Sequence, residues 1–137
     1  MDSLQRFLDA QAPVYPDVLA ELRAGRKQSH WMWFIFPQLR GLGHSAMAQR
    51  YGIASRTEAQ AYVQHPVLGA RLKDCMALLL AHPGLSAEDL LGDIDALKLR
   101  SCATLFARVA PQEPLFTQVL QRFYSGMRCH KTEELLG

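Results

Sequence analysis

Cysteine is scarce in this chain, and its spacing excludes two common kinds of small protein. The 137 residues contain three cysteines, Cys75, Cys102 and Cys129. An odd number of widely spaced thiols, with no C-x-x-C pair, supports neither a disulfide framework nor a zinc site. Cys75 and Cys102 fall on apolar faces of expected helices, which favours buried, unreactive thiols. We therefore expect a protein of the reducing cytoplasm.

An excess of one charge and long apolar runs are also missing. The net charge is +2, and basic residues stand singly apart from Arg23, Arg26 and Lys27. Because no basic stripe is interleaved with aromatic residues, we expect no nucleic-acid partner. No window approaches the roughly 18 apolar residues of a membrane span, and the N-terminus lacks the apolar core of a signal peptide. We expect no association with a membrane.

The familiar catalytic and cofactor motifs are absent as well. The five histidines are far apart in the sequence and lack metal-ligand spacing, so no metal is expected. The sequence contains no G-x-S-x-G or S-x-x-K nucleophile motif, no phosphate-binding loop and no dinucleotide fingerprint. The sequence therefore indicates no cofactor and leaves open whether the protein is an enzyme.

Helical periodicity is what the chain does contain, along almost its whole length. Apolar residues make up 49% of the composition and recur at the spacing that buries one face of a helix. Ser3, Ser45 and the capping box Ser55–Glu58 predict helix starts, and Gly25 predicts a left-handed stop. The longest expected helix spans Asp93 to Val109. Since no linker or repeat interrupts the pattern, we expect one all-α domain over residues 1–137.

The most distinctive segment runs from Ser29 to Gln38, with the sequence SHWMWFIFPQ, and holds both tryptophans. Its six consecutive large apolar side chains, Trp31 to Phe36, require burial. Aromatic and β-branched residues favour a strand. A lone strand would leave backbone groups unpaired in the core, however, and no other segment looks like its partner. We therefore predict a short buried central helix, with His30 and Gln38 at its polar edges.

Motifs spread over the whole chain resemble one bacterial family. They are Phe7, Ala10-Gln11, Tyr15, Gly25, Lys27, the block from Ser29 to Leu39, Gly41-Leu42-Gly43, Ser45, Tyr51, Glu58-Ala59, Tyr62, His65-Pro66, Leu68-Gly69, Arg71-Leu72, Gly92, Asp95, Lys98-Leu99, Ser101, Thr104-Leu105-Phe106 and Gly126. With them the chain resembles the uncharacterised family called domain of unknown function 1810. The resemblance implies a multihelical fold with an unusual short buried central helix. It implies no activity.

The chain departs from that family's pattern at one position. The family usually has an aspartate three residues after the glycine equivalent to Gly126, and Cys129 stands there in this sequence. Thr132, which the family also has, is expected to cap a terminal turn. The departure weighs against a role for that acidic group here. Some family members carry the label calpastatin, but an inhibitor of that type resembles a disordered repeat protein, whereas this chain has the composition of a compact one.

Polar residues at the edges of the aromatic segment are candidates for a site, and each has a structural alternative. His30 could exchange a proton near neutral pH, or it could be a core histidine bonded to a backbone carbonyl. Trp33 could stack on a flat ring or belong to the core; because Trp31 and Trp33 are two residues apart, at most one of them lines a pocket. Arg26 and Lys27 could frame an anion site together with residues 41–43, or those residues could form only a turn.

The expected helix over residues 93–109 carries a second polar set. Asp95, Lys98 and Ser101 follow one another at three-residue intervals, and Thr104 extends the series. This helix also buries apolar residues, Leu97 among them. The polar residues form either a solvated face with an Asp95–Lys98 ion pair or a binding edge. In a binding edge, Lys98 faces an anion, the hydroxyl groups donate hydrogen bonds, and Asp95 orients a partner such as His30.

Three hypotheses follow for the function. The first is binding of a small anionic or nucleotide-like metabolite where residues 26–38 meet residues 95–104. Its candidate ligand-binding residues are Lys27, His30, Trp33, Gln38, Asp95, Lys98, Ser101 and Thr104. The second is a protein–protein interaction module with no ligand. The third is a small enzyme in which His30 is the acid/base, Asp95 stands behind it and Lys98 stabilises negative charge.

One geometric expectation separates these hypotheses. The first and third require a concave pocket that contains His30 and at least two of Lys98, Ser101 and Gln38. A broad exposed apolar patch away from that region favours the interaction module instead. The oligomeric state stays open at this point.

Overall fold

The regular structure of the chain is helical, as the periodicity predicts. A computed structural model describes residues 4–137, and the expected Ser3 cap lies outside them. Within the described range the elements are α1 (Gln5–Gln11), α2 (Tyr15–Ala24), α3 (Met32–Ile35), α4 (Ala46–Tyr51), α5 (Arg56–Gln64), α6 (Leu68–Leu80), α7 (Ala87–Leu91), α8 (Asp93–Val109), α9 (Leu115–Tyr124) and α10 (His130–Leu136). The all-α fold class is thereby confirmed. None of these helices combines the length and apolarity needed to cross a bilayer.

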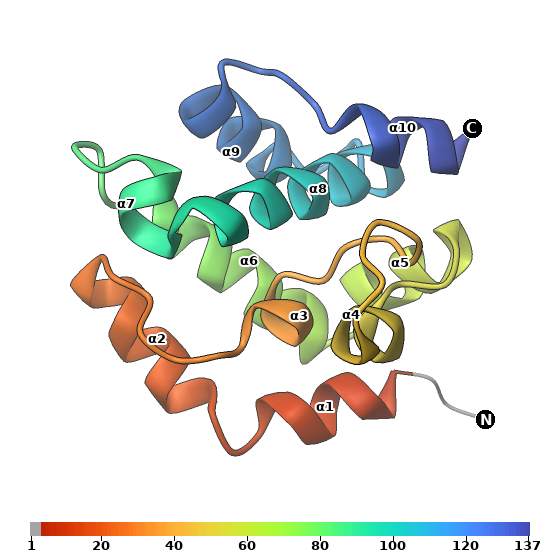
Figure 1. Ribbon diagram of the computed structural model, residues 1–137, viewed down its shortest axis with the longest axis horizontal. Coiled ribbons are helices and arrows are strands. Elements are labelled where there is room, and N and C mark those ends of the chain that lie inside the picture. Colours follow the sequence, from red (N-terminus) through yellow and green to blue (C-terminus); the bar gives the residue numbers. More distant parts are fainter. Residues whose placement is uncertain (1–3) are drawn as a thin grey trace.

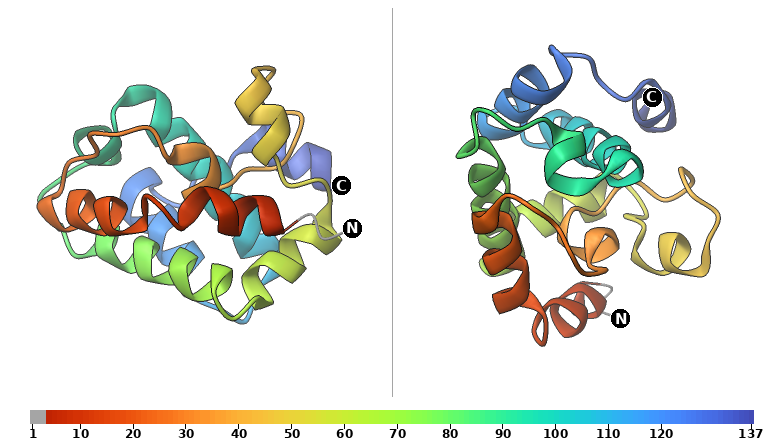
Figure 2. Two further views of the ribbon diagram at one scale, coloured as in Figure 1. Left: turned by 90° about the horizontal axis from the view of Figure 1, so that it is seen from below. Right: turned by 60° about the vertical axis from the view of Figure 1, so that its left-hand side comes forward.

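Two long helices and one very short one organise the packing (Figure 1). Helix α8 contacts α5, α7, α9 and α10, and α6 contacts α2, α3, α5 and α9. The four-residue helix α3 lies near the centre and also touches α1 and α4. Helix α4 lies at the periphery in both views of Figure 2. The aromatic segment is therefore surrounded by helices from both halves of the chain.

The aromatic segment forms the predicted buried helix, but only four of its six consecutive apolar residues, Met32 to Ile35, are helical. Trp31, Met32 and Ile35 are almost fully buried, and the helix ends at Ile35. Beyond it the chain is extended: Ile53 donates its N–H to the Gln38 carbonyl at 2.9 Å, and Arg40 donates to the Ile53 carbonyl at 2.8 Å. This short parallel bridge supplies the strand partner that the sequence does not reveal. Backbone pairing with residue 53 thus fixes the position of Gln38.

Two polar side chains, the buried Gln11 and the half-buried Glu21, hold this segment and the turn before it. On one side the Gln11 amide donates to the Phe34 carbonyl at 2.7 Å and to the Tyr62 hydroxyl at 3.0 Å. On the other side the Glu21 carboxylate accepts hydrogen bonds from the backbone N–H groups of Gln28 and Ser29, at 2.6 and 2.9 Å, and from the Trp31 indole at 3.0 Å. The Gln11 amide thus satisfies a backbone carbonyl of α3, and the Glu21 carboxylate satisfies backbone N–H groups of the turn before it.

The Glu21 carboxylate has a strongly shifted titration. Burial acts to raise its pKa, but the hydrogen bonds from the Ser29 hydroxyl, from the backbone of Gln28 and Ser29 and from Trp31 outweigh this effect and lower the pKa from 4.5 to about 2. The charged form is therefore part of the folded structure at neutral pH. The turn that precedes α3, which carries Lys27 and His30, is built on this one carboxylate.

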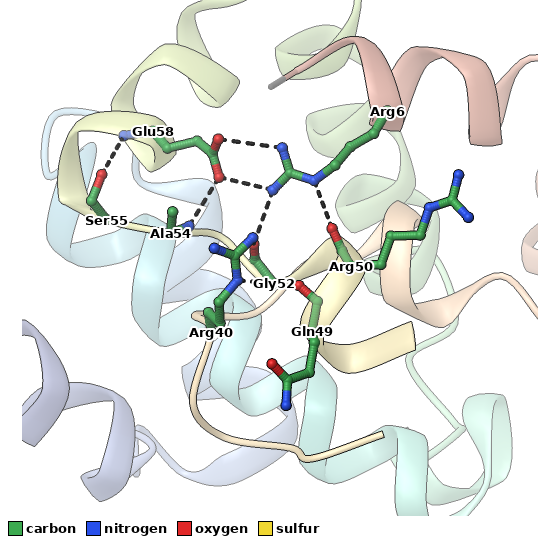
Figure 3. A network of polar contacts seen from close by, with 8 residues as sticks. All are labelled: Arg6, Arg40, Gln49, Arg50, Gly52, Ala54, Ser55 and Glu58. Carbon is green, nitrogen blue, oxygen red and sulfur yellow. Dashed lines mark hydrogen bonds and ion pairs between the residues drawn. The ribbon is translucent and has the colours of Figure 1, made fainter. Parts of the chain in front are cut away.

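Arginine side chains close the C-terminal end of α4 (Figure 3). Arg6 donates to the carbonyls of Arg50 and Gly52 at 2.7 and 2.9 Å and forms an ion pair with Glu58 at 2.9 Å. Arg40 donates to the carbonyls of Gln49 and Gly52, both at 3.1 Å. Cations are favourable at the carbonyl end of a helix, where backbone acceptors lack intrahelical partners. The network attaches α4 to α1 and α5, which positions the side chains of α4.

The helix boundaries confirm most of the predicted caps and correct one. Gly25 has φ +77°, as a left-handed stop requires, and Ser45 accepts a hydrogen bond from the Ala48 N–H at 3.1 Å. Ser55 accepts from the Glu58 N–H at 3.2 Å. The expected cap at Thr132 is wrong: Cys129 is the N-cap residue of α10, and Thr132 is buried within that helix.

The start of α8 also corrects an expectation about burial. Leu97 is not buried: it is 59% exposed, and Ile94, one turn earlier, is 72% exposed. The first two turns of α8 bury Ala96 and Leu99 and leave the flank of Ile94 and Leu97 in solvent. Two large apolar side chains therefore stand on the surface beside the polar residues of the same helix.

Candidate functional site

An acidic side chain joins the two predicted polar sets. The Asp95 carboxylate lies 3.0 Å from the Lys27 ammonium and 3.6 Å from the Lys98 ammonium. The expected Asp95–Lys98 pair is thus present, and Lys27 adds a second cation from the turn before α3. The side chains are largely buried, with exposed fractions of 9% for Lys27, 17% for Asp95 and 25% for Lys98. We call these three residues the charged triad.

Each lysine of the charged triad also lies over a tryptophan. The Lys27 ammonium is 5.0 Å from the centre of the Trp31 ring, and the Lys98 ammonium is 4.9 Å from the centre of the Trp33 ring. Both distances are within the range of a cation–π attraction. Trp31 is 1% exposed and belongs to the core, whereas Trp33 is half-buried and lines a cavity. This division of roles agrees with the two-residue spacing of the tryptophans.

The cavity beside Trp33 is an aromatic recess between α3 and α4. It is nearly filled, with a free volume of about 10 Å³, and its walls are Met32, Trp33, Phe36, Gln38, Met47, Ala48, Tyr51, Gly52 and Lys98. We call it the inner recess. The walls are apolar except for the Gln38 amide and the Lys98 ammonium. Met47 and Tyr51, four residues apart on α4, were not singled out from the sequence as site residues, although this spacing places them on one helix face.

A second, wider depression continues from the inner recess on the other side of Lys98. It has a free volume of about 270 Å³ and is lined by Gln38, Leu42, Gly43, Ile94, Leu97, Lys98 and Ser101. We call it the outer groove. Gln38 and Lys98 line both cavities. The described residues that line these two cavities include no carboxylate, so Lys98 gives the whole surface a positive character.

His30 lies elsewhere, which corrects two expectations about it. Its side chain is exposed, so it is not a core histidine, and it lines a separate shallow hollow with Lys27, Leu91, Gly92, Asp93, Ile94 and Asp95. No hydrogen bond joins it to Asp95 in the described part of the chain, because that carboxylate pairs with the two lysines. The expected single pocket is therefore divided: Lys98, Ser101 and Gln38 share one cavity, and His30 lies in another.

The hydroxyl groups of α8 differ in position. Ser101, 7% exposed, reaches the outer groove, and its hydroxyl donates to the Leu97 carbonyl at 3.3 Å. Thr104 is fully buried; its hydroxyl donates to the Arg100 carbonyl at 2.8 Å and accepts the Cys129 N–H at 2.9 Å. Thr104 therefore holds the loop before α10 and lines neither the recess nor the groove. Neither residue belongs to a solvated face.

Cys129 lies directly behind Ser101, with 3.3 Å between its sulfur and the Ser101 hydroxyl oxygen. Burial acts to raise the pKa of this thiol, but the hydrogen bond from Ser101 and the charge of Arg100 act to hold it below its ordinary value. The surroundings thus favour a negative group at this position. That preference fits the aspartate that the resemblance implies there. The other two cysteines are buried, and burial raises the pKa of both.

Comparisons with known proteins agree with this fold and give no activity. No curated protein matches the chain significantly. The solved structure described as the conserved hypothetical protein Rv1873 from Mycobacterium tuberculosis is similar at 53% identity and a TM-score of 0.96, over 97% of this chain and 95% of that one. Residues 1–136 match the family described as protein of unknown function DUF1810. The chain therefore belongs to the DUF1810 family, as its H-W-M-W and H-P-x-L-G-x-R-L motifs predict.

Proposed function

We propose that this protein binds a small anionic metabolite with a flat ring, of the nucleotide-like kind, across the inner recess and the outer groove. The observation that carries the proposal is the position of Lys98. Its ammonium lies over Trp33 at the boundary of an aromatic cavity and a polar one. A ligand with an apolar ring and an acidic group offers the matching chemistry on both sides of this boundary.

The polar groups around Lys98 suit the oxygens of an acid. The Gln38 amide and the Ser101 hydroxyl line the outer groove beside the ammonium. The amide can donate hydrogen bonds, and the hydroxyl can donate one by turning its single proton away from the Leu97 carbonyl and the Cys129 sulfur. The hollow around His30 is less suitable for an anion, because Asp93 and Asp95 line it. We therefore place the acidic group in the outer groove.

The inner recess suits the ring. Trp33, Phe36 and Tyr51 provide aromatic walls on which a flat ring can stack. The recess is narrow, and one wall is Met47, an unbranched side chain that changes rotamer readily. A ring therefore enters by displacing this side chain, while the arginine network of Figure 3 keeps the backbone of α4 in place.

A thermal-shift screen against cellular nucleotides, phosphorylated metabolites and aromatic acids at millimolar concentration tests the proposal. A ligand that binds the folded state raises the melting temperature by mass action. The shift is expected to disappear in Lys98→Met and to persist in Lys131→Met, which removes an exposed lysine from α10 that lines none of these cavities. Failure of every compound to stabilise the protein, or an unchanged shift in Lys98→Met, contradicts the proposal.

A protein-binding surface is a second candidate, because Ile94 and Leu97 are exposed beside the outer groove. Large apolar side chains in solvent are typical of interaction sites when they cluster. Replacing both by serine is expected to abolish retention of a protein partner from cell extract and to leave the melting temperature within about 2 °C of the wild type. A partner retained equally by the double variant excludes this surface.

We also propose a cytoplasmic location, supported by the three free and buried cysteines. The acid/base role of His30 gains no supporting contact from its exposed position. The role therefore stays a prediction. Measuring a ligand-dependent reaction in the wild type and in His30→Ala would test it.

A further inference from the structure

The charged triad shows an asymmetry that bears on which anion the site accepts. Lys98 lines both the inner recess and the outer groove, whereas Lys27 and Asp95 line neither of them. A ligand in these cavities therefore meets one ammonium directly, with a carboxylate directly behind it. The triad has a formal net charge of one positive unit.

Asp95 is held more firmly by Lys27 than by Lys98. The distance to Lys27 is 3.0 Å and the distance to Lys98 is 3.6 Å. Lys27 is itself fixed, because its backbone N–H donates to the Leu90 carbonyl at 2.8 Å and its ammonium lies over Trp31. When an anion draws Lys98 into the groove, the carboxylate stays with Lys27. Asp95 thus remains close to any ligand that Lys98 binds.

We infer, on the basis of the proposed function, that the site selects ring compounds with a single negative charge, and that Asp95 sets this selectivity. One acidic group is neutralised by Lys98, and its remaining oxygens take the neutral donors of Gln38 and Ser101. A second negative charge finds no further cation among the described residues that line the two cavities, and the Asp95 carboxylate repels it. Aromatic monocarboxylates and phosphodiesters fit this rule. Phosphomonoesters, which carry about two charges above their second pKa of roughly 6, do not. Among nucleotide-like ligands the rule therefore favours phosphodiesters, such as cyclic nucleotides, over nucleoside monophosphates.

Benzoate and phenyl phosphate test the inference as matched probes at pH 8, with one ring each and one or two charges. We expect wild-type protein to bind benzoate more tightly, by about tenfold. In Asp95→Asn the affinity for phenyl phosphate is expected to rise about three- to tenfold, which reduces or cancels the preference for benzoate, because the second charge no longer meets a carboxylate. Dissociation constants from calorimetric titration, or from quenching of the tryptophan fluorescence, provide the measurement.

Two further variants separate selectivity from structural damage. Asp93→Asn removes the same charge two residues away, where no ion pair is formed in the described structure, and is expected to change either affinity less than about twofold. Asp95→Glu keeps the carboxylate and is expected to retain the wild-type preference for benzoate. Loss of folded protein lowers the apparent affinities for benzoate and phenyl phosphate together and leaves their ratio unchanged. A ratio that changes in Asp95→Asn but not in Asp93→Asn or Asp95→Glu therefore shows that the carboxylate acts on the ligand.

The outcomes distinguish this inference from the function on which it rests. If neither probe binds any of these proteins at millimolar concentration, the proposed site itself is contradicted. If both probes bind and the affinity ratio is the same in wild type and Asp95→Asn, the site stands and the role of Asp95 is overturned. Equal shifts in Asp93→Asn and Asp95→Asn also overturn it, because a general charge effect then accounts for the change.

Discussion

Asp95 lies between Lys27 and Lys98, 3.0 Å from one ammonium and 3.6 Å from the other. The first lysine precedes the central helix α3, and the second shares α8 with Asp95. A single carboxylate therefore connects the two sequence regions that meet beside the aromatic recess. The inequality of the two distances has a measurable consequence for stability.

Double-mutant cycles are expected to find unequal couplings to Asp95. The Lys27–Asp95 coupling, from Lys27→Met and Asp95→Asn, should be about 1–2 kcal/mol because the pair is short and mostly buried. The Lys98–Asp95 coupling should be smaller, below about 0.5 kcal/mol, because this pair is longer, at 3.6 Å, and Lys98 is the more exposed of the two lysines. The free energy of unfolding in urea measures both. Equal couplings would mean that Asp95 interacts as strongly with Lys98 as with Lys27.

The depressed pKa of Glu21 predicts a specific loss of stability in acid. A carboxyl whose pKa is lower in the folded protein stabilises the fold above its ordinary pKa, here 4.5, and this contribution disappears as the pH falls towards about 2. We expect Glu21→Gln to lower the free energy of unfolding by about 2 kcal/mol at pH 7 and by much less at pH 3.

Urea denaturation at both pH values checks this expectation for Glu21. Glu113→Gln is the matched control, because the Glu113 side chain lies in the loop between α8 and α9 and makes no hydrogen bond or ion pair among the described contacts. It should change stability by less than about 0.5 kcal/mol. A Glu21→Gln deficit of the same size at pH 3 and pH 7 would show that charge is not the source of the stabilisation.

Gly69, near the start of α6, is expected to tolerate no side chain. A Cβ atom at this position would lie 2.1 Å from the Val63 carbonyl oxygen, a backbone atom that no rotamer change can move. We expect Gly69→Ala to cost about 3 kcal/mol or more, since α5 and α6 must separate. Gly84→Ala, where no atom lies within 4 Å of the added carbon, is the control and should be nearly neutral. Thermal unfolding of both variants decides whether the close approach is essential.

Cys129 predicts a stabilising substitution. It is the N-cap residue of α10, and its side chain makes no capping hydrogen bond. Aspartate is among the preferred N-cap residues and would also accept the Ser101 hydroxyl that now faces the sulfur. Cys129→Asp is therefore expected to raise the free energy of unfolding by about 1 kcal/mol, whereas Cys129→Ala should lower it. If Cys129→Asp destabilises the protein, the surroundings of residue 129 do not favour a negative group.

Helix positions were predictable from the sequence where local signals decide them. Ser45, Gly25 and the 93–109 periodicity act within one or two turns, so their predictions are confirmed. The prediction of Thr132 as a cap is wrong because helix α10 begins three residues earlier, with Cys129 at the N-cap position. Cysteine is not among the preferred N-cap residues, so the sequence did not indicate this start. The bridge between Leu39 and Ile53 was not predictable, since a single backbone pair leaves no sequence pattern.

The sequence by itself determined that the segment from Trp31 to Phe36 lies in the core, because no solvated arrangement exists for six large apolar side chains in a row; all of them except the half-buried Trp33 are buried. It also determined the helical class and the family. Only the tertiary structure decided which polar residues meet: it placed Gln38 and Ser101 beside Lys98, left His30 in a separate hollow and buried Thr104. Those outcomes depend on the approach of α4 and α8 to the central helix, which is set by packing between distant segments.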